Sequence, residues 1–211
     1  MAGATTWSGA DADDDGRPSD RRRERGLRTR RNIVRAAIDL IEAGNPRPTT
    51  EQVARRAGVS TRLVFHHFRR LEVVIRLAAE LQAGRHRSFV AIIPPRGPLP
   101  ARIAAICRQR RKLFEATGPV LRVAYARELD TPGLTEVLGR QRALLRQQLE
   151  VTLGPEISSH GGEPELLIDI LENTTGWQYW SGLRFEAGLS SSAAERAMAS
   201  AVSELLDRSG R

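Results

Sequence analysis

The segment from 49 to 68 limits the fold of this chain more tightly than any other, because it encodes two short helices joined by a sharp turn. Thr49 followed three residues later by Gln52 has the form of a capping box, which predicts the start of a helix. Gly58 suits the positive φ of a turn, and Ser60 can cap a second helix that runs to position 68. These signals predict a helix-turn-helix, a unit whose second helix can lie across the major groove of DNA.

Apolar residues at helical spacing flank this segment on both sides and predict further helices. One stripe runs from Ile33 to Ile41 and another from Leu71 to Leu81. A stretch rich in Pro and Gly at 94–100 is the clearest internal boundary. Beyond it we expect helices at about 101–116, 119–129, 133–153, 164–187 and 191–207.

The predicted fold class is all-α, because aromatic residues make up only 5% of the chain and strand-like alternation is rare. Residues 1–20 are rich in Gly, Ser, Asp and Ala, and we expect them to form a disordered tail. A three-helix helix-turn-helix domain should follow at 21–70. We expect a long helix to join it to a C-terminal helical domain at 71–211.

The positive charge of the chain is confined to one segment. Residues 1–20 carry one Arg and five Asp. Residues 21–93 carry 17 basic and six acidic side chains, whereas residues 94–211 carry 15 basic and 14 acidic side chains. A positive field over one domain is typical of a protein that binds a polyanion. Arg21–Arg25 open this basic segment, either as a solvated helix start or as an arm that touches DNA.

Several classes of function are disfavoured by the residues that would be needed for them. Cys107 is the single cysteine and lies among helix formers, so we interpret it as a packing residue. His66 and His67 are adjacent on a helix and point in different directions, which disfavours a shared metal ion. No catalytic motif, long apolar run or signal peptide is evident. We therefore expect a cytoplasmic protein that is not an enzyme and needs no cofactor.

The segment 49–68 resembles the N-terminal signature of the tetracycline-repressor (TetR) family. The matching positions are Thr49, Val53, Ala54, Ala57, Gly58, Val59, Ser60, Phe65 and Phe68. The resemblance extends over residues 28 to about 80 and implies a DNA-binding transcription regulator. Two positions depart from the family pattern: Phe65 stands where Tyr is usual, and Leu71 stands where Lys is usual.

The resemblance and the charge pattern together indicate candidate DNA contacts. Arg62, near the start of the second helix, is the best candidate to read a base, since a guanidinium can pair with guanine O6 and N7. The alternative is that Arg62 reaches only a phosphate. Thr61, Leu63 and His66 are secondary candidates for base contacts. The full set of DNA-binding candidates is Arg47, Thr49, Arg55, Arg56, Ser60, Thr61, Arg62, Leu63, His66, His67, Arg69 and Arg70.

In the family, the last two helices form the dimer interface and the C-terminal domain encloses an effector. The resemblance therefore implies dimerisation through 164–187 and 191–207, although an intramolecular core is an alternative. The dimer candidates are Leu166, Leu167, Ile170, Leu171, Ala197, Ala201, Leu205 and Leu206. An apolar or aromatic effector could contact Phe114, Arg122, Tyr125, Gln141, Trp177, Gln178 and Trp180.

These expectations combine into a repressor that binds a palindromic operator as a homodimer and is released by a small-molecule effector. One alternative is a ligand-independent regulator, in which the aromatic residues only form a core. Another is a protein-interaction adaptor that uses the basic face on an acidic partner. The loss of polar groups at Phe65 and Leu71 favours the adaptor slightly.

Overall fold

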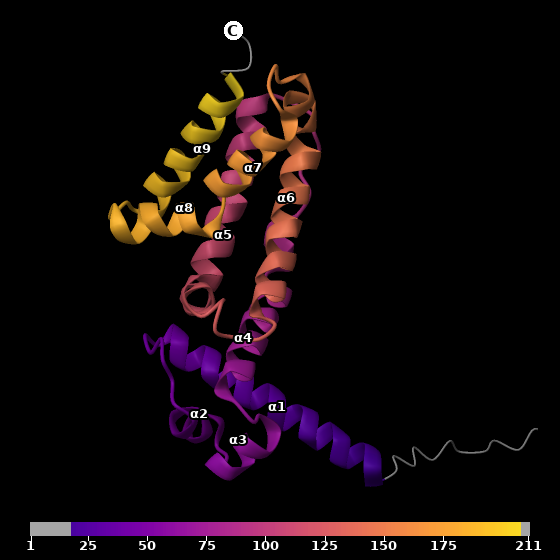
Figure 1. The fold of residues 1–211 in the computed structure, drawn as a ribbon, viewed down its shortest axis with the longest axis vertical. Coiled ribbons are helices and arrows are strands. Elements are labelled where there is room, and N and C mark those ends of the chain that lie inside the picture. The colour runs from indigo at the N-terminus through magenta and orange to yellow at the C-terminus, as the bar shows by residue number, and fades with distance from the viewer. Residues whose placement is uncertain (1–17, 208–211) are drawn as a thin grey trace, which may run out of the picture.

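A long helical body stands on a smaller group of helices at the N-terminal end (Figure 1). The structure is a computed structural model and describes residues 18–207. Helices account for all the regular structure in this range. They are α1 (Pro18–Glu42), α2 (Thr50–Ala57), α3 (Thr61–His67), α4 (Leu71–Arg85), α5 (Leu99–Ala126), α6 (Leu134–Ser159), α7 (Pro164–Thr174), α8 (Trp177–Ser181) and α9 (Ser191–Asp207), with a 3-10 turn at Arg87–Val90 and a π-helical turn at Gly182–Glu186.

The N-terminal group consists of α1, α2 and α3, with α4 packed against it. Ile33, Ala37 and Ile38 of α1 are buried and meet Val53 of α2 and Val64 of α3 in a continuous core. The stripe predicted at 33–41 is therefore the inner face of α1. This helix begins at Pro18, inside the segment expected to be a disordered tail, and residues 1–17 lie outside the described part of the chain.

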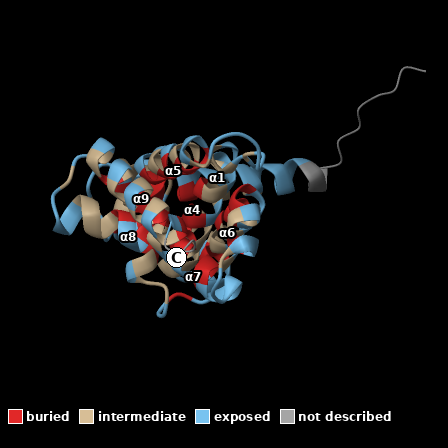
Figure 2. Cartoon of the chain, turned by 90° about the horizontal axis from the view of Figure 1, so that it is seen from above, coloured by how far each residue is buried: buried red, intermediate tan, exposed pale blue. Residues whose placement is uncertain are grey.

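Helix α4 is buried on more than one side. Val74, Ile75 and Ala78 are fully buried, and Leu77 and Leu81 pack partly against the same core. The helix contacts α1 as well as α5 and α6. The apolar residues therefore occupy most of its circumference, and α4 joins the N-terminal group to the helical body. Figure 2 shows the buried residues of this body on the inward faces of α4, α5 and α6.

Two helices run through prolines at which the sequence predicted a break. The predicted helices 101–116 and 119–129 are one helix, α5, which continues across Pro119. Helix α6 likewise continues across Pro155 to Ser159, past the predicted end at 153. Each proline follows a glycine, Gly118 or Gly154, which has no Cβ to clash with the proline ring. Buried apolar residues on both sides then hold each helix together across the lost hydrogen bond.

The prediction of one continuous helix at 164–187 is wrong, because the helix is broken at Thr175 and Gly176. The Thr175 hydroxyl donates back to the Leu171 carbonyl oxygen at 2.8 Å. Gly176 is extended, with φ −83° and ψ 173°, and a Cβ there would lie 3.0 Å from the Glu172 carbonyl oxygen. The break lets α8 run crosswise to α7 (Figure 1), and this carries Trp177 into the core.

The remaining C-terminal prediction is confirmed, since α9 covers 191–207. None of the helices within residues 18–207 has the length and apolar character needed to cross a lipid bilayer.

Cys107 is fully buried in α5, and burial raises the pKa of its thiol to about 12. Thiol reagents attack the thiolate, so a thiol with this pKa and no solvent contact should not react at pH 8. We expect Cys107 to stay unlabelled by a thiol-specific reagent in the native protein and to label fully in denaturant, as followed by mass spectrometry. Rapid labelling under native conditions would contradict the packing role.

Candidate functional site

The helix-turn-helix forms as its local signals predict, with a cap at the start of each helix. The Thr49 hydroxyl accepts from the Gln52 N–H, and the Gln52 side chain accepts from the Thr49 N–H at 2.9 Å. Gly58 ends α2 with a left-handed φ of 68°, which glycine adopts without strain. The Ser60 hydroxyl accepts from the Leu63 N–H at the start of α3. Thr49 and Ser60 therefore have structural roles as helix caps.

One side of helix α3 is buried in the core and the other side is exposed to solvent. Val64 and Phe68 are buried in the core. Arg62 and His66 are exposed on the outer side. The exposed and half-buried side chains of α3 are Thr61, Arg62, Leu63, Phe65, His66 and His67.

The C-terminal end of α3 is tied to α1 through Arg30. The Arg30 guanidinium donates to the His67 carbonyl oxygen at 2.8 Å and lies over the Phe68 ring, 4.5 Å from its centre. Burial, with smaller effects of His66 and Arg30, lowers the pKa of His67 below its usual value. The His67 ring is therefore neutral at neutral pH and can act as a hydrogen-bonding group.

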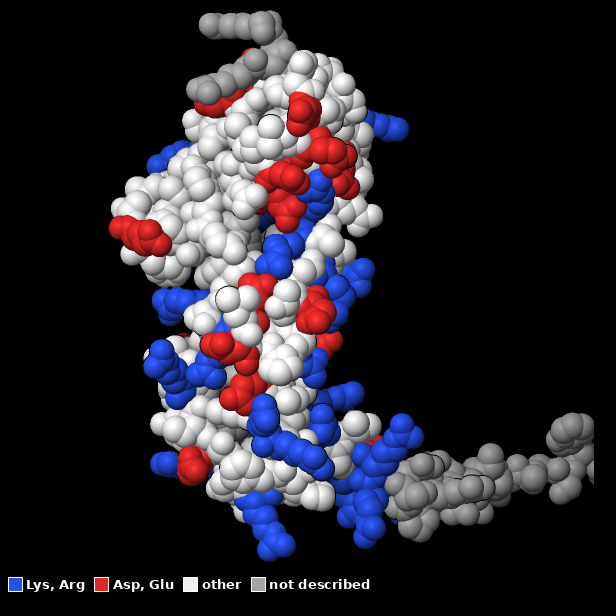
Figure 3. All heavy atoms as spheres, viewed as in Figure 1, with Lys and Arg blue, Asp and Glu red and all other residues white. Residues whose placement is uncertain are grey.

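Five arginines outside α3 are among the predicted DNA contacts, and four of them are exposed at the surface without an ion pair in the described structure: Arg47, Arg55, Arg69 and Arg70. Arg56 differs from them, because it forms an ion pair with Asp39 of α1, with 3.0 Å between Arg56 Nη2 and Asp39 Oδ2. Lys and Arg side chains gather over the N-terminal helices, whereas acidic side chains are mixed with basic ones over the body (Figure 3).

The two departures from the family pattern are visible at this surface. Phe65 is 53% exposed, so an apolar ring stands where the resemblance implies a phenol. Leu71 is partly buried and packs against the core at the first turn of α4. Neither side chain offers a phosphate a hydrogen-bond donor.

A cavity of about 240 Å³ lies in the helical body, between α5, α6, α7 and α8. It is lined by Phe114, Leu121, Tyr125, Gln141, Arg142, Leu145, Glu172, Asn173, Gly176, Trp177 and Gln178. Five of these, Phe114, Tyr125, Gln141, Trp177 and Gln178, are among the predicted effector contacts. Their aromatic rings are in contact: Tyr125 stacks on Trp177 with centroids 6.4 Å apart, and Phe114 meets the same indole edge-on at 5.7 Å.

Two predicted effector contacts lie outside the cavity lining. Arg122 places its guanidinium over the Phe185 ring, 5.2 Å from the centre. Trp180 is buried against Phe114 with centroids 6.0 Å apart, so it supports the wall from behind. Sequence reasoning also missed Leu145, although it follows Gln141 by one helical turn and helical spacing could have indicated it.

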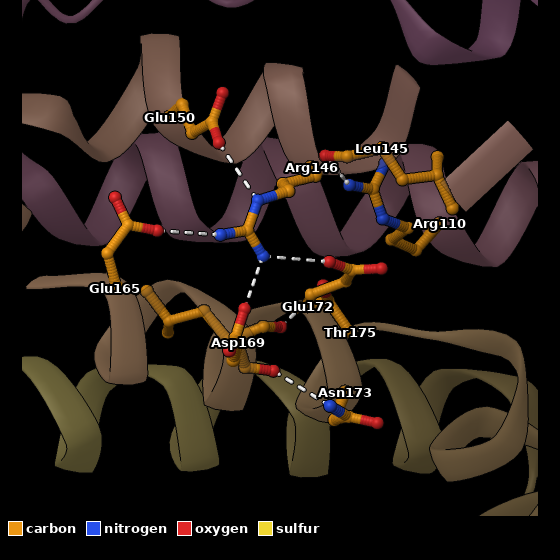
Figure 4. A network of polar contacts seen from close by, with 10 residues as sticks. Arg110, Leu145, Arg146, Glu150, Glu165, Asp169, Glu172, Asn173 and Thr175 are labelled. Atoms are coloured by element: carbon orange, nitrogen blue, oxygen red, sulfur yellow. Dashed lines mark hydrogen bonds and ion pairs between the residues drawn. The ribbon is translucent and has the colours of Figure 1, made fainter. Parts of the chain in front are cut away.

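The charged residues of the lining are already paired. Arg142 forms an ion pair with Glu128 at 3.2 Å. Glu172 pairs with Arg146, which also binds Glu150, Glu165 and Asp169 (Figure 4). The hydrogen bonds that Arg146 donates to Asp169 and, with a smaller effect, to Glu172 hold the pKa of Arg146 above its usual value. This network ties α6 to α7 beside the cavity and leaves the lining without an unpaired charge.

Arg110 is buried near this network without a carboxylate partner. Its Nη1 donates to the Gln148 side-chain oxygen at 2.6 Å, and its Nη2 donates to the Leu145 carbonyl oxygen at 3.0 Å. Nε has no hydrogen-bond partner in the described structure. Burial lowers the pKa of Arg110 to about 10, which still leaves it charged at neutral pH.

The predicted dimer residues fall into two groups in the protomer. Leu166 and Ile170 are exposed one turn apart on α7, whereas Leu167 and Leu171 are buried inside the protomer. The candidates on α9 are half-buried (Ala197, Ala201 and Leu205) or buried (Leu206).

The chain shares its fold and its N-terminal region with known regulators. Residues 33–70 match the family of bacterial regulatory proteins described as the tetR family. A transcriptional regulator from Rhodococcus sp. Rha1 has a TM-score of 0.67 and 19% identity, over 86% of this chain and 98% of that one. A tetR-family transcriptional regulator from Streptomyces coelicolor has a TM-score of 0.67 and 18% identity, over 85% of this chain and 83% of that one.

The sequence match and the structural similarity cover different parts of the chain. The structural neighbours share the fold, while the family match covers the helix-turn-helix itself. No curated protein matches the chain in sequence. The helix-turn-helix region of this chain therefore matches the tetR family in sequence, and the chain as a whole shares the fold of its structural neighbours.

Proposed function

We propose that this chain is a DNA-binding transcription regulator of the tetR family and acts as a repressor, which binds a palindromic operator as a homodimer and leaves it when a small molecule binds. The observation that supports the DNA contacts is the orientation of α3, with Val64 and Phe68 buried and Arg62 exposed. We take residues 21–70 as the DNA-binding domain and 71–211 as the regulatory and dimerisation domain. The protein would act in the cytoplasm, on the chromosome.

In this proposal, Arg62 reads a base and Arg55 binds a phosphate. Arg62→Ala should cost about 1–3 kcal/mol on the preferred site and relax the base preference at one position of each half-site. Arg55→Ala should weaken all sequences alike. Selection of duplexes from a random pool, followed by titrations, measures both. If Arg62→Ala lowers affinity uniformly and the selected sequence is unchanged, Arg62 contacts only phosphate.

Dimerisation is supported by the apolar side chains that α7 leaves exposed. Leu166 is 54% and Ile170 38% exposed, one turn apart on the same face, and apolar patches of this kind are typical of interfaces. A two-fold dimer would present two identical recognition helices, which is why the operator should be palindromic with half-sites about one turn apart.

The double variant Leu166→Glu with Ile170→Glu should therefore be a monomer, because four charges would meet across the two-fold axis. Leu129→Glu is the matched control, since Leu129 is 97% exposed and lies on the α5–α6 connection. Sedimentation at several concentrations measures the mass. A wild-type chain that stays monomeric with and without duplex DNA would exclude the dimer.

An effector is supported by the aromatic cavity of the helical body. Its volume, about 240 Å³, is slightly below the range of about 300–1,000 Å³ that holds drug-sized ligands, so it suits a small molecule. Since its charged residues are paired, we expect a neutral apolar or aromatic effector. Helix α4 contacts α1, α5 and α6, and offers a path to the DNA-binding domain.

A bound effector should change the fluorescence of Trp177 and weaken operator binding by roughly 5- to 150-fold, and operator DNA should weaken effector binding by the same factor. Gln141→Trp should fill the cavity and abolish the response without loss of DNA binding. Gln147→Trp, exposed on the same helix and outside the cavity, is the control. DNA affinity that is indifferent to a broad panel of metabolites would leave a ligand-independent regulator.

An adaptor function is the second candidate, and the exposed Phe65 ring favours it. The two candidates differ in salt dependence. Affinity for duplex DNA should fall steeply with salt when several phosphates are neutralised. A chain that binds duplex DNA negligibly at low salt would favour an acidic protein partner instead.

A further inference from the structure

An apolar groove lies between α1 and α4. Leu27 and Val34 of α1 and Leu77 and Leu81 of α4 form its walls, and its volume is about 580 Å³. Leu27 is 47% exposed, so its side chain is accessible to an occupant of the groove. An open apolar groove of this size in a soluble domain is typical of a binding surface.

The rim of the groove is positively charged. Arg30, Arg31 and Arg85 line it together with one acidic residue, Glu80. The helix α1 carries further arginines toward its N-terminus, at Arg21, Arg22, Arg23, Arg25 and Arg28. An occupant that combines an apolar side chain with negative charge would match both the walls and the rim.

The chain itself contains such a segment immediately before α1. Trp7 is followed by Asp11, Asp13, Asp14 and Asp15, with small residues between them. This segment lies within residues 1–17, outside the described part of the chain. Trp7 is the one tryptophan that the aromatic cluster of the body does not contain, since Trp177 and Trp180 are both there.

The segment before α1 is long enough to reach the groove. Trp7 lies eleven residues before Pro18, and eleven extended residues span up to about 36 Å. Leu27 lies nine helical residues after Pro18, a rise of about 14 Å, and Val34 about 10 Å further. A chain that turns back along α1 can therefore place Trp7 between Leu27 and Leu81 and lay the aspartates along the arginines.

We propose that residues 7–15 dock in the α1–α4 groove of the same protomer, with Trp7 against the leucines and the aspartates beside the arginines. A tethered segment competes at an effective concentration in the millimolar range, so weak contacts suffice. The docked aspartates also neutralise part of the positive field of α1, on which long-range attraction of DNA depends. The segment is then an internal competitor of DNA phosphates.

The docking is tested on the full chain labelled with 5-fluorotryptophan, whose three tryptophans give three fluorine resonances. Trp7→Ser identifies the Trp7 signal by its loss. In the native chain the fluorine chemical shift of Trp7 should differ from its value in urea. Leu27→Gln should return this chemical shift to the value in urea. The Trp177 and Trp180 signals should not move, which shows that the fold is intact. Leu129→Gln, an equally conservative change at an exposed leucine, should leave all three unchanged.

The competition with DNA is tested by affinity. Trp7→Ser leaves the net charge unchanged but should release the segment, so its affinity for duplex DNA at low salt should rise severalfold above that of the wild type. If the Trp7 chemical shift in the native chain equals its value in urea, the docking is overturned. If that chemical shift changes when the protein is diluted, the segment docks on a second copy instead. A displaced signal with equal DNA affinities would overturn the competition.

Discussion

The two-sided burial of α4 is the constraint on which the rest of this structure depends. Val74, Ile75 and Ala78 are fully buried, and α4 contacts α1 below as well as α5 and α6 above. A helix of this kind cannot shift against one neighbour without disturbing the other, because protein interiors are close-packed. Helix α4 therefore ties α1 of the N-terminal group to α5 and α6, two of the helices that enclose the aromatic cavity.

The polar contacts inside the body determine how the remaining helices meet. Arg110 has no carboxylate partner and is held by Gln148 and the Leu145 carbonyl of α6. Breaking such a contact leaves a buried charge unsatisfied, which costs several kcal/mol. Arg146 then joins α6 to α7 through four carboxylates. These contacts fix the register of α5, α6 and α7, and with it the shape of the cavity that they enclose.

In the N-terminal domain, the residues that anchor α3 are different from the residues that α3 exposes to solvent. Val64 and Phe68 anchor the helix, and Arg30 bonds its last carbonyl, so the outer side chains are not needed for packing. Arg62 and His66 can therefore vary without loss of the fold. Arg56 is an exception among the basic residues, since Asp39 already neutralises it. Its contribution to DNA affinity should be smaller than that of the unpaired arginines.

The sequence by itself determined the elements whose signals are local. The capping box at Thr49, the left-handed Gly58 and the cap at Ser60 each act within a few residues, so the helix-turn-helix was predictable to within one residue. The division of charge and most of the aromatic lining could also be read from the sequence. Only the tertiary structure decided that α5 continues across Pro119 and that the C-terminal region breaks at Gly176. It also placed Trp180 behind the cavity wall and brought Arg142 and Glu172 into the lining. The reason is that burial against distant helices outweighs local helix preference, and the sequence does not state which helices will meet.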